Sequence, residues 1–208
     1  MIIQHNLTNI NKFYRIFSVK KMNVYDFDNT IYDGESVVDF FFYYCKKDKS
    51  LLKHIPSLIY ALMKYKKGQV TIEGALAKYG EAVGEYYRNN PTMQQDMVDF
   101  WDKHMHKIKP FYKEIQSDDD LIISGSPEFS LDIICKRLGI RKYIGSIIEE
   151  NGNIKRLCIR ENKVTAFLNE YPHTEIENFY TDSVNDLPLI EISKNAYLVK
   201  GNKITKIK

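Results

Sequence analysis

Cysteine is scarce in this sequence. The chain of 208 residues has three cysteines, Cys45, Cys135 and Cys158, which lie far apart and form no Cys-x-x-Cys pair. Such a pattern favours neither a disulfide framework nor a zinc site, which need paired and closely spaced cysteines. A reducing, cytoplasmic location is the prediction that follows.

Long apolar runs are also missing. The first twenty residues contain Asn6, Asn9, Lys12 and Arg15, which interrupt the continuous apolar stretch of a secretory signal. Later apolar runs are too short to span a bilayer. We interpret residues 1–21 as an N-terminal extension, because Met22 stands directly before the first convincing strand.

Charge of one sign is not in large excess. The formal net charge is +3, and no stripe of clustered arginines interleaved with aromatic residues is present. Nucleic acid is therefore not an expected partner. The sequence also lacks a Gly-x-Ser-x-Gly elbow, a Gly-Lys-Ser/Thr phosphate loop and a dinucleotide fingerprint, which argues against the enzyme classes that use them.

What the sequence does contain is a repeated strand-turn-helix pattern. Short apolar runs, read as buried strands, lie at residues 23–27, 121–123, 176–180 and 196–199, and helical spacing follows at 129–138 and 185–192. Repeated units of this kind predict an α/β fold with a Rossmann-like parallel sheet and helices on both faces. Residues 147–159 read as a hairpin that turns at Asn151-Gly152.

A long insert separates the first two units. It covers roughly eighty residues with helical periodicity and few turn signals, far more than an ordinary crossover connection needs. Leu51, Ile55 and Leu58 share one face of an expected helix, in which Pro56 marks a first turn or a break. We expect an inserted helical cap of residues 35–114 and a core domain of residues 22–34 and 115–208.

Two pairs of acids lie at the carboxyl ends of predicted strands. Asp26 and Asp28 lie at the end of the first strand, and Asp182 and Asp186 lie around the start of the helix after residues 176–180. Carboxylates gathered at strand ends suit Mg2+, which prefers carboxylates, water and substrate phosphate. The alternatives are an ordinary turn in which Asp28 bonds its own backbone, and helix capping by Asp182 or Asp186.

A serine-rich turn and a lysine complete the candidate site. Ser124-Gly125-Ser126 follows the middle strand and offers a hydroxyl and closely spaced backbone N–H groups, which suit an anion. A serine that caps the following helix explains the same residues. Lys163 is either solvated surface or the fixed positive charge that phosphoryl transfer needs.

The order of these motifs resembles that of haloacid dehalogenase (HAD)-like phosphatases. The matching segments are Asp26-Phe27-Asp28-Asn29-Thr30, Ser124 after apolar residues, Lys163, and Asp182-Ser183-Val184-Asn185-Asp186. The long insert between the first two motifs looks like the C1-type cap of the group that includes phosphoserine phosphatase, subfamily IB. Two positions depart from the family pattern, because Asn29 and Thr181 stand where glycine is more usual.

The resemblance implies a role for each matching residue. Asp26 would be the nucleophile that forms an aspartyl phosphate, and Asp28 the general acid and then the general base. The phosphate group would be held by Asn29, Ser124, Gly125 and Lys163. Magnesium would be bound by Asp26, the backbone carbonyl of Asp28 and Asp182, with Asp186 in support.

Substrate choice is predicted from Glu35, nine residues after Asp26. Phosphoserine phosphatases carry a glutamate at this offset that meets the substrate's amino group, although Glu35 is also placed to cap a helix beginning near Ser36. A substrate carboxylate would further need a cap arginine, and Arg88, the only one available, does not match those enzymes well in its spacing. The sequence thus favours a small phosphate monoester other than phosphoserine.

Other functions remain open at this point. The same chemistry serves a phosphotransferase, and the same fold serves a protein that binds a phosphorylated ligand without turnover. The apolar and lysine-rich segment from Phe40 to Gly68 also suits peripheral contact with an anionic membrane and a lipid phosphate substrate. The sequence does not predict an oligomeric state.

Overall fold

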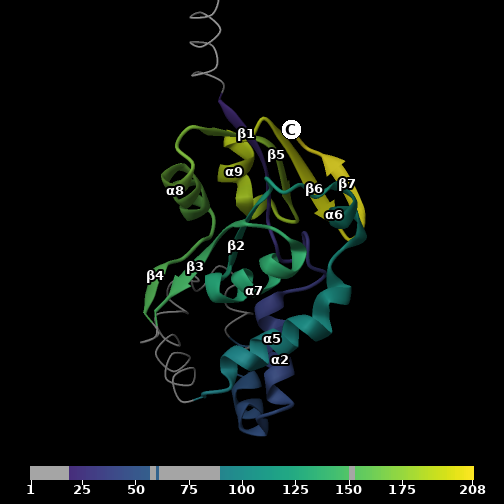
Figure 1. The fold of residues 1–208 in the computed structure, drawn as a ribbon, viewed down its shortest axis with the longest axis vertical. Coiled ribbons are helices and arrows are strands. Elements are labelled where there is room, and N and C mark those ends of the chain that lie inside the picture. Colours follow the sequence, from purple (N-terminus) through teal and green to yellow (C-terminus); the bar gives the residue numbers. More distant parts are fainter. Residues whose placement is uncertain (1–18, 57–59, 61–89, 150–152) are drawn as a thin grey trace, which may run out of the picture.

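The computed structural model describes residues 19–56, 60, 90–149 and 153–208 (Figure 1). A sheet of seven strands runs through it in the order β4-β3-β2-β1-β5-β6-β7. The strands are β1 (Lys20–Tyr25), β2 (Leu121–Pro127), β3 (Lys142–Ile148), β4 (Ile154–Arg156), β5 (Thr174–Thr181), β6 (Asn195–Lys200) and β7 (Lys203–Lys206).

The five strands from β3 to β6 are parallel, and the two edge strands, β4 and β7, pair antiparallel. The expected α/β fold with a Rossmann-like sheet is confirmed. Strand β3 also pairs with β4 as the hairpin prediction requires, although the Asn151-Gly152 turn lies outside the described residues. Strand β7 was not predicted, and β1 begins at Lys20, two residues before the expected start of the core.

Helices connect these strands. The α-helices are α2 (Ser36–Cys45), α5 (Met93–His104), α6 (Pro110–Ile115), α7 (Glu128–Leu138), α8 (Glu161–Glu170) and α9 (Leu187–Ile192). Short 3-10 helices are η1 (Lys49–His54), η2 (Met105–Lys107) and η3 (Val184–Asp186). Leu51 belongs to η1, whereas Leu58 lies outside the described residues. No helix in the described ranges is long and apolar enough to cross a membrane.

Two apolar clusters cover opposite faces of the sheet. Successive side chains of a strand point to opposite faces, so Val24 belongs to one cluster and Tyr25 to the other. The Val24 cluster includes Phe167 of α8 and Leu189 of α9. The Tyr25 cluster includes residues of α5, α6 and α7, so that the sheet is enclosed between two helical layers.

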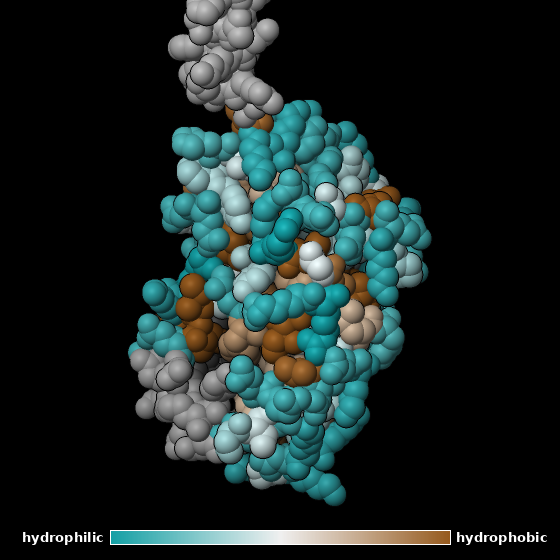
Figure 2. Space-filling view, in the orientation of Figure 1, coloured by the Kyte–Doolittle hydropathy of each residue, from teal (hydrophilic) through white to brown (hydrophobic). Residues whose placement is uncertain are grey.

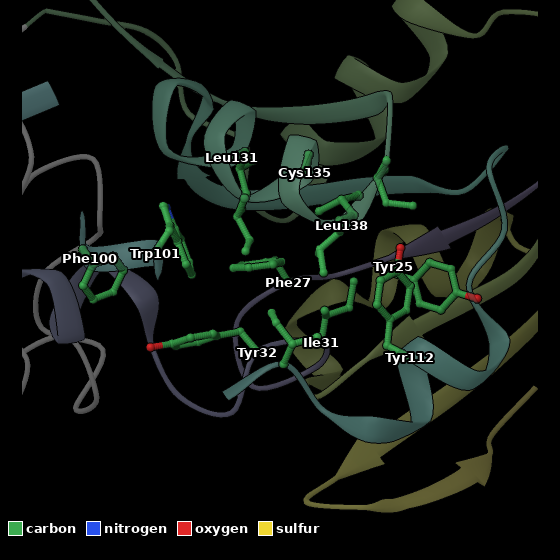
Figure 3. Close-up of a cluster of buried hydrophobic side chains, with 14 of the residues drawn as sticks. Tyr25, Phe27, Ile31, Tyr32, Phe100, Trp101, Tyr112, Leu131, Cys135 and Leu138 are labelled. Atoms are coloured by element: carbon green, nitrogen blue, oxygen red, sulfur yellow. The ribbon is translucent and has the colours of Figure 1, made fainter. Parts of the chain in front are cut away.

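Helix α5 is part of the core, although it belongs to the predicted cap. Its Trp101 is fully buried with Phe27, which follows β1, and its indole N–H donates to the Ser130 hydroxyl of α7 over 3.2 Å. Figure 3 shows Phe27, Tyr32, Trp101 and Leu131 gathered in this cluster. The C-terminal part of the insert, which contains α5, is therefore packed against the segment that carries Asp26 and Asp28.

Asp96 ties the start of α5 to the end of α2. Its carboxylate is 5% exposed, accepts a 2.9 Å hydrogen bond from the Thr92 hydroxyl and pairs with the ammonium of Lys47, just beyond α2. Burial alone would raise the pKa of Asp96, but the hydrogen bonds from Lys47 and Thr92 outweigh it and lower the pKa.

We predict that Asp96→Asn lowers the free energy of unfolding at pH 7 by about 1.5–3 kcal/mol, the usual contribution of hydrogen bonds to a charged group. The folded pKa is depressed, so this stabilisation is fully present above the unfolded value of about 3.9 and is lost as the pH falls through the folded pKa. Denaturant titrations of both proteins at several pH values measure the difference, which should shrink below about pH 4.

The matched control is Asp99→Asn, because the Asp99 carboxylate is exposed and 3.9 Å from the same lysine. It should cost less than about 1 kcal/mol. An equal loss in both variants, or a loss for Asp96→Asn that is independent of pH, would contradict the assignment.

Candidate active site

The predicted motifs meet at the carboxyl edge of the parallel sheet. Asp26 and Asp28 follow β1, the middle strand, whose neighbours are β2 with Ser124 and β5, which ends just before Asp182. In open α/β sheets this edge is where ligands bind. Residues separated by more than 150 positions in the chain are thereby brought to one place.

Lys163 joins two of the predicted acids. Its ammonium is 2.8 Å from the Asp26 carboxylate and 2.9 Å from that of Asp186, and the three side chains are buried. Burial by itself lowers the pKa of Lys163, but the two carboxylates more than offset this and raise it. The solvated-surface interpretation of Lys163 is therefore wrong.

Two threonines support the same pair of acids. The Thr30 hydroxyl donates to the second oxygen of Asp26 over 3.3 Å, and the Thr181 hydroxyl donates to Asp186 over 2.9 Å. Both threonines are fully buried. Threonine in place of the more usual glycine at this position therefore has a structural reason, because the Thr181 hydroxyl holds the Asp186 carboxylate.

Asp28 is held by the beginning of the insert and by β2. One carboxylate oxygen accepts from the backbone N–H of Ser36 over 2.7 Å, and the other accepts from the Ser126 hydroxyl over 2.7 Å. Ser36 is the first residue of α2, so the positive end of that helix lies against Asp28. Burial raises the pKa of Asp28, and these hydrogen bonds oppose it. The simple-turn alternative does not account for these partners.

Residues 124–126 lie where the pairing of β2 and β3 is interrupted. Ile123 pairs with Ile144 and Pro127 with Ser146, which leaves the intervening residues out of regular register. The Ser124 hydroxyl accepts from the backbone N–H of Ser126 over 3.0 Å. Helix α7 begins only at Glu128 and has no side-chain cap, so the serines do not cap it. At Gly125 a Cβ would lie 3.2 Å from the side chain of Ile159, a tight approach.

The second acidic pair does not cap a helix either. The cap of η3 is the Ser183 hydroxyl, which accepts from the backbone N–H of Asn185 over 3.1 Å, and Asp186 makes no cap hydrogen bond to α9. Burial raises the pKa of Asp182, as does the negative charge of Asp186, while Lys200 opposes both. Among the described residues, no side-chain donor is hydrogen-bonded to the Asp182 carboxylate.

Asn29 and Glu35 contact one another. Asn29 has a φ of 57°, a left-handed conformation that glycine adopts more readily, and its amide donates to Glu35 over 2.6 Å. Glu35 precedes α2 but makes no cap hydrogen bond. The Glu35 side chain lies beside the candidate site, close enough to Asp28 for the two charges to interact. Arg88 lies outside the described residues.

The arrangement of the acids suits magnesium, which takes few ligands from the protein, and does not form a complete set of metal ligands. Within the described ranges, no three carboxylate, imidazole or thiol side chains converge closely enough to hold a metal by themselves. Mg2+ is usually bound by one or two carboxylates, with waters and substrate phosphate filling the other positions. Burial raises the pKa of Asp26, and the negative charges of Asp186 and Asp28 raise it further, against the effect of Lys163. This excess of negative charge favours a bound cation.

Comparison of the sequence with models of known protein families agrees with the family suggested by these motifs. The model of the haloacid dehalogenase-like hydrolases matches residues 24–191. The chain belongs to this family. A histidinol-phosphatase from Neisseria meningitidis serogroup C (strain 8013) is 26% identical across an alignment that covers 84% of this chain and 87% of that protein. Together they confirm the expected enzyme class of this HAD hydrolase, a phosphoric monoester hydrolase.

Solved structures show the same fold. A protein of unknown function from Bordetella pertussis Tohama I has a TM-score of 0.72 at 17% identity, covering 86% of this chain and 89% of that one. A phosphoserine phosphohydrolase-like protein from Francisella tularensis subsp. tularensis SCHU S4 has a TM-score of 0.54 at 19% identity, covering 85% of each chain. Both likenesses concern the fold alone.

Sequence reasoning missed several polar residues of this HAD hydrolase. Thr30, Ser36 and Ser126 contact Asp26 or Asp28, and buried Lys109 contacts the backbone of Asn29. Ser126 belongs to the predicted turn of residues 124–126, but the sequence did not indicate its hydrogen bond to Asp28. Thr30 belongs to the matching segment of residues 26–30 but received no role, the only signal for Ser36 was its closeness in sequence to Asp28, and Lys109 gave none.

A groove between α5 and α7 does not belong to the site. It is lined by the apolar residues Met93, Met97, Phe129 and Ile133 and by the polar residues Gln94 and Asp132. Figure 2 shows apolar side chains reaching the surface across the middle of this otherwise largely hydrophilic face. No acid of the four motifs lines the groove.

We predict that Lys163→Met lowers the rate of phosphate release by at least about 100-fold, because it removes a fixed positive charge beside the reacting group. It should also lower the free energy of unfolding by about 3–5 kcal/mol, since two buried carboxylates lose their partner. Steady-state hydrolysis of an aryl phosphate and denaturant titration measure the two effects.

Lys142→Met is the control, because Lys142 pairs with Asp119, whose side chain is 65% exposed. This variant should be active and nearly as stable as the wild type. Near-normal turnover of folded Lys163→Met would rule out the role given to Lys163.

Proposed function

We propose that this HAD hydrolase is a Mg2+-dependent phosphatase that hydrolyses a small phosphate monoester through an aspartyl phosphate on Asp26. The observation that carries the proposal is the buried contact of Asp26 with Lys163, beside the hydrogen-bonded carboxyl of Asp28. A carboxylate nucleophile, a fixed cation and a proton donor are the groups that this reaction needs.

In the first step, a carboxylate oxygen of Asp26 attacks the phosphorus atom, and the bond from phosphorus to the ester oxygen breaks. Lys163 holds Asp26 in place and offsets negative charge on the phosphoryl oxygens. The neutral carboxyl of Asp28 gives its proton to the departing oxygen. The raised pKa of Asp28, caused mainly by burial, supports this role.

In the second step, water attacks the phosphorus atom of the aspartyl phosphate. Asp28, now ionised, accepts a proton from that water, and the bond between Asp26 and phosphorus breaks. Inorganic phosphate leaves, and both acids return to their starting states. Ser124 and the backbone N–H groups near Gly125 hold the phosphoryl oxygens through both steps.

Magnesium would be held by Asp26, the backbone carbonyl of Asp28 and Asp182, with Asp186 in support. When bound, it would shield the approach of the negative phosphate to the negative nucleophile. Among the described residues no side chain donates a hydrogen bond to the Asp182 carboxylate, which supports its role as a ligand.

For the substrate, we favour a phosphate ester that carries an amino group but no carboxylate. One carboxylate oxygen of Glu35 accepts a hydrogen bond from the Asn29 amide. The acidic side chain of Glu35 lies beside the site and suits a positively charged group of the substrate. The histidinol-phosphatase relative fits this class by its name, since histidinol phosphate has an amino group and no carboxylate. The cytoplasmic location remains a prediction from the cysteine pattern.

The proposal predicts that the wild type releases phosphate from an aryl phosphate with Mg2+ and that excess chelator stops the release. Asp26→Asn should abolish turnover, because an amide is neither a nucleophile nor an adequate metal ligand. Asp28→Asn should still be phosphorylated by a good leaving group and should accumulate labelled aspartyl enzyme. Full activity in chelator, or turnover by Asp26→Asn, would reject the mechanism.

The ratio kcat/KM should be higher for histidinol phosphate and phosphoethanolamine than for sugar phosphates or lysophospholipid phosphates. Glu35→Gln should remove much of this preference while leaving an aryl phosphate little affected, because a neutral amide attracts the amino group less.

Glu114→Gln, a change at an exposed position of α6, is the control. A strong preference for phosphoserine that is lost in both Glu35→Gln and Arg88→Ala would instead show that the substrate carries a carboxylate. Preference for the lysophospholipid phosphate would favour the membrane-surface alternative.

A further inference from the structure

Lys109 is a buried lysine that the proposed steps do not use. It precedes α6, on the segment that returns from the insert, and its side chain is only 4% exposed. Its ammonium donates to the backbone carbonyl of Asn29, in the loop that carries Asp26 and Asp28. A buried lysine needs a partner of this kind, because removing an ammonium from water is costly.

The backbone around Lys109 is already fixed without its side chain. The N–H of Asp33 donates to the carbonyl of Lys107 over 2.8 Å, and the N–H of Lys109 donates to that of Ile31 over 2.8 Å. Tyr32 and Ile108 form an antiparallel bridge between these two bonds. These backbone bonds join the segment before the insert to the segment at its C-terminal end. The Lys109 ammonium adds a further bond, from the second segment to Asn29.

Asn29 is a position that needs restraint. Its left-handed φ of 57° is uncommon for a residue other than glycine, and it directly follows Asp28. Its N–H donates to the Gly34 carbonyl over 2.9 Å, its side chain donates to Glu35, and its carbonyl accepts from Lys109. Rotation of this residue would displace Asp28, because the two share a peptide bond.

The charges around Lys109 also connect it with the site. Burial lowers the pKa of Lys109, and so does Lys200, while the negative charges of Asp33 and Asp182 oppose this. Lys109 therefore lies within electrostatic reach of Asp182, one of the proposed ligands. A charged donor gives a stronger hydrogen bond to a carbonyl than a neutral one, which suits a restraining role.

We propose that Lys109 is a positioning residue of the active site, which holds Asn29 and thereby Asp28 in the arrangement that proton transfer requires. This inference rests on the proposed phosphatase function. Lys109 acts through Asn29 and does not itself touch the substrate. Its loss should therefore lower kcat and leave KM almost unchanged.

The test compares Lys109→Met and Lys109→Gln with Lys107→Met. Lys107 is the matched control, because it lies on the same segment and its ammonium pairs with the Asp39 carboxylate instead of the Asn29 carbonyl. With an aryl phosphate and Mg2+, the Lys109 variants should lose about 10–100-fold in kcat, the scale of a small misplacement of reacting groups. Lys107→Met should keep its kcat.

Amide hydrogen exchange supplies a second readout that does not depend on turnover. In the Lys109 variants, the amides of Asn29 and Ile31 should exchange faster, while that of Val24 in β1 should be unchanged. If the wild type released no phosphate, the proposed function would fail, and the exchange data would still decide whether Lys109 restrains Asn29.

Three results would overturn the proposal. The first is a folded Lys109 variant with wild-type kcat, and the second is an equal loss of kcat in Lys107→Met. The third is that both Lys109 variants fail to fold where Lys107→Met folds, which would make Lys109 a purely structural residue.

Discussion

The contact of one buried ammonium with two buried carboxylates is the interaction on which the site depends. Lys163 comes from α8, Asp26 follows β1 and Asp186 ends η3, so three separate parts of the chain must arrive together. Charges taken out of water are stabilising only when their geometry and remaining hydrogen bonds are good. Thr30 and Thr181 supply those hydrogen bonds, which explains why the acids tolerate nearly complete burial.

The insert contributes to the site through both of its described ends. At its start, the backbone N–H of Ser36 binds Asp28 and brings the positive end of α2 to the acids. At its end, Trp101 packs on Phe27 in the main apolar cluster. The loop that carries Asp26 and Asp28 is therefore in contact with both described ends of the insert, and its shape depends on packing that is continuous with the sheet.

Electrostatics and burial act against each other at this edge of the sheet. Burial raises the pKa values of Asp26, Asp28 and Asp182, and the negative charge of Asp186 raises those of Asp26 and Asp182 further. Lys163 and Lys200 oppose this only in part. A site of this kind gains most when a cation and a phosphate bind together, because each offsets the charge of the other.

The α/β fold and the order of the motifs that contain Asp26, Asp28, Lys163, Asp182 and Asp186 could be predicted from the sequence alone. Apolar runs of three to five residues followed by polar turns are local signals, and parallel strands bring their carboxyl ends to one edge. Three features could be known only from the folded chain: Lys163 is buried, Ser126 binds Asp28 and Lys109 reaches Asn29. These contacts join residues 80 to 137 positions apart, whose meeting depends on the packing of helices against the sheet.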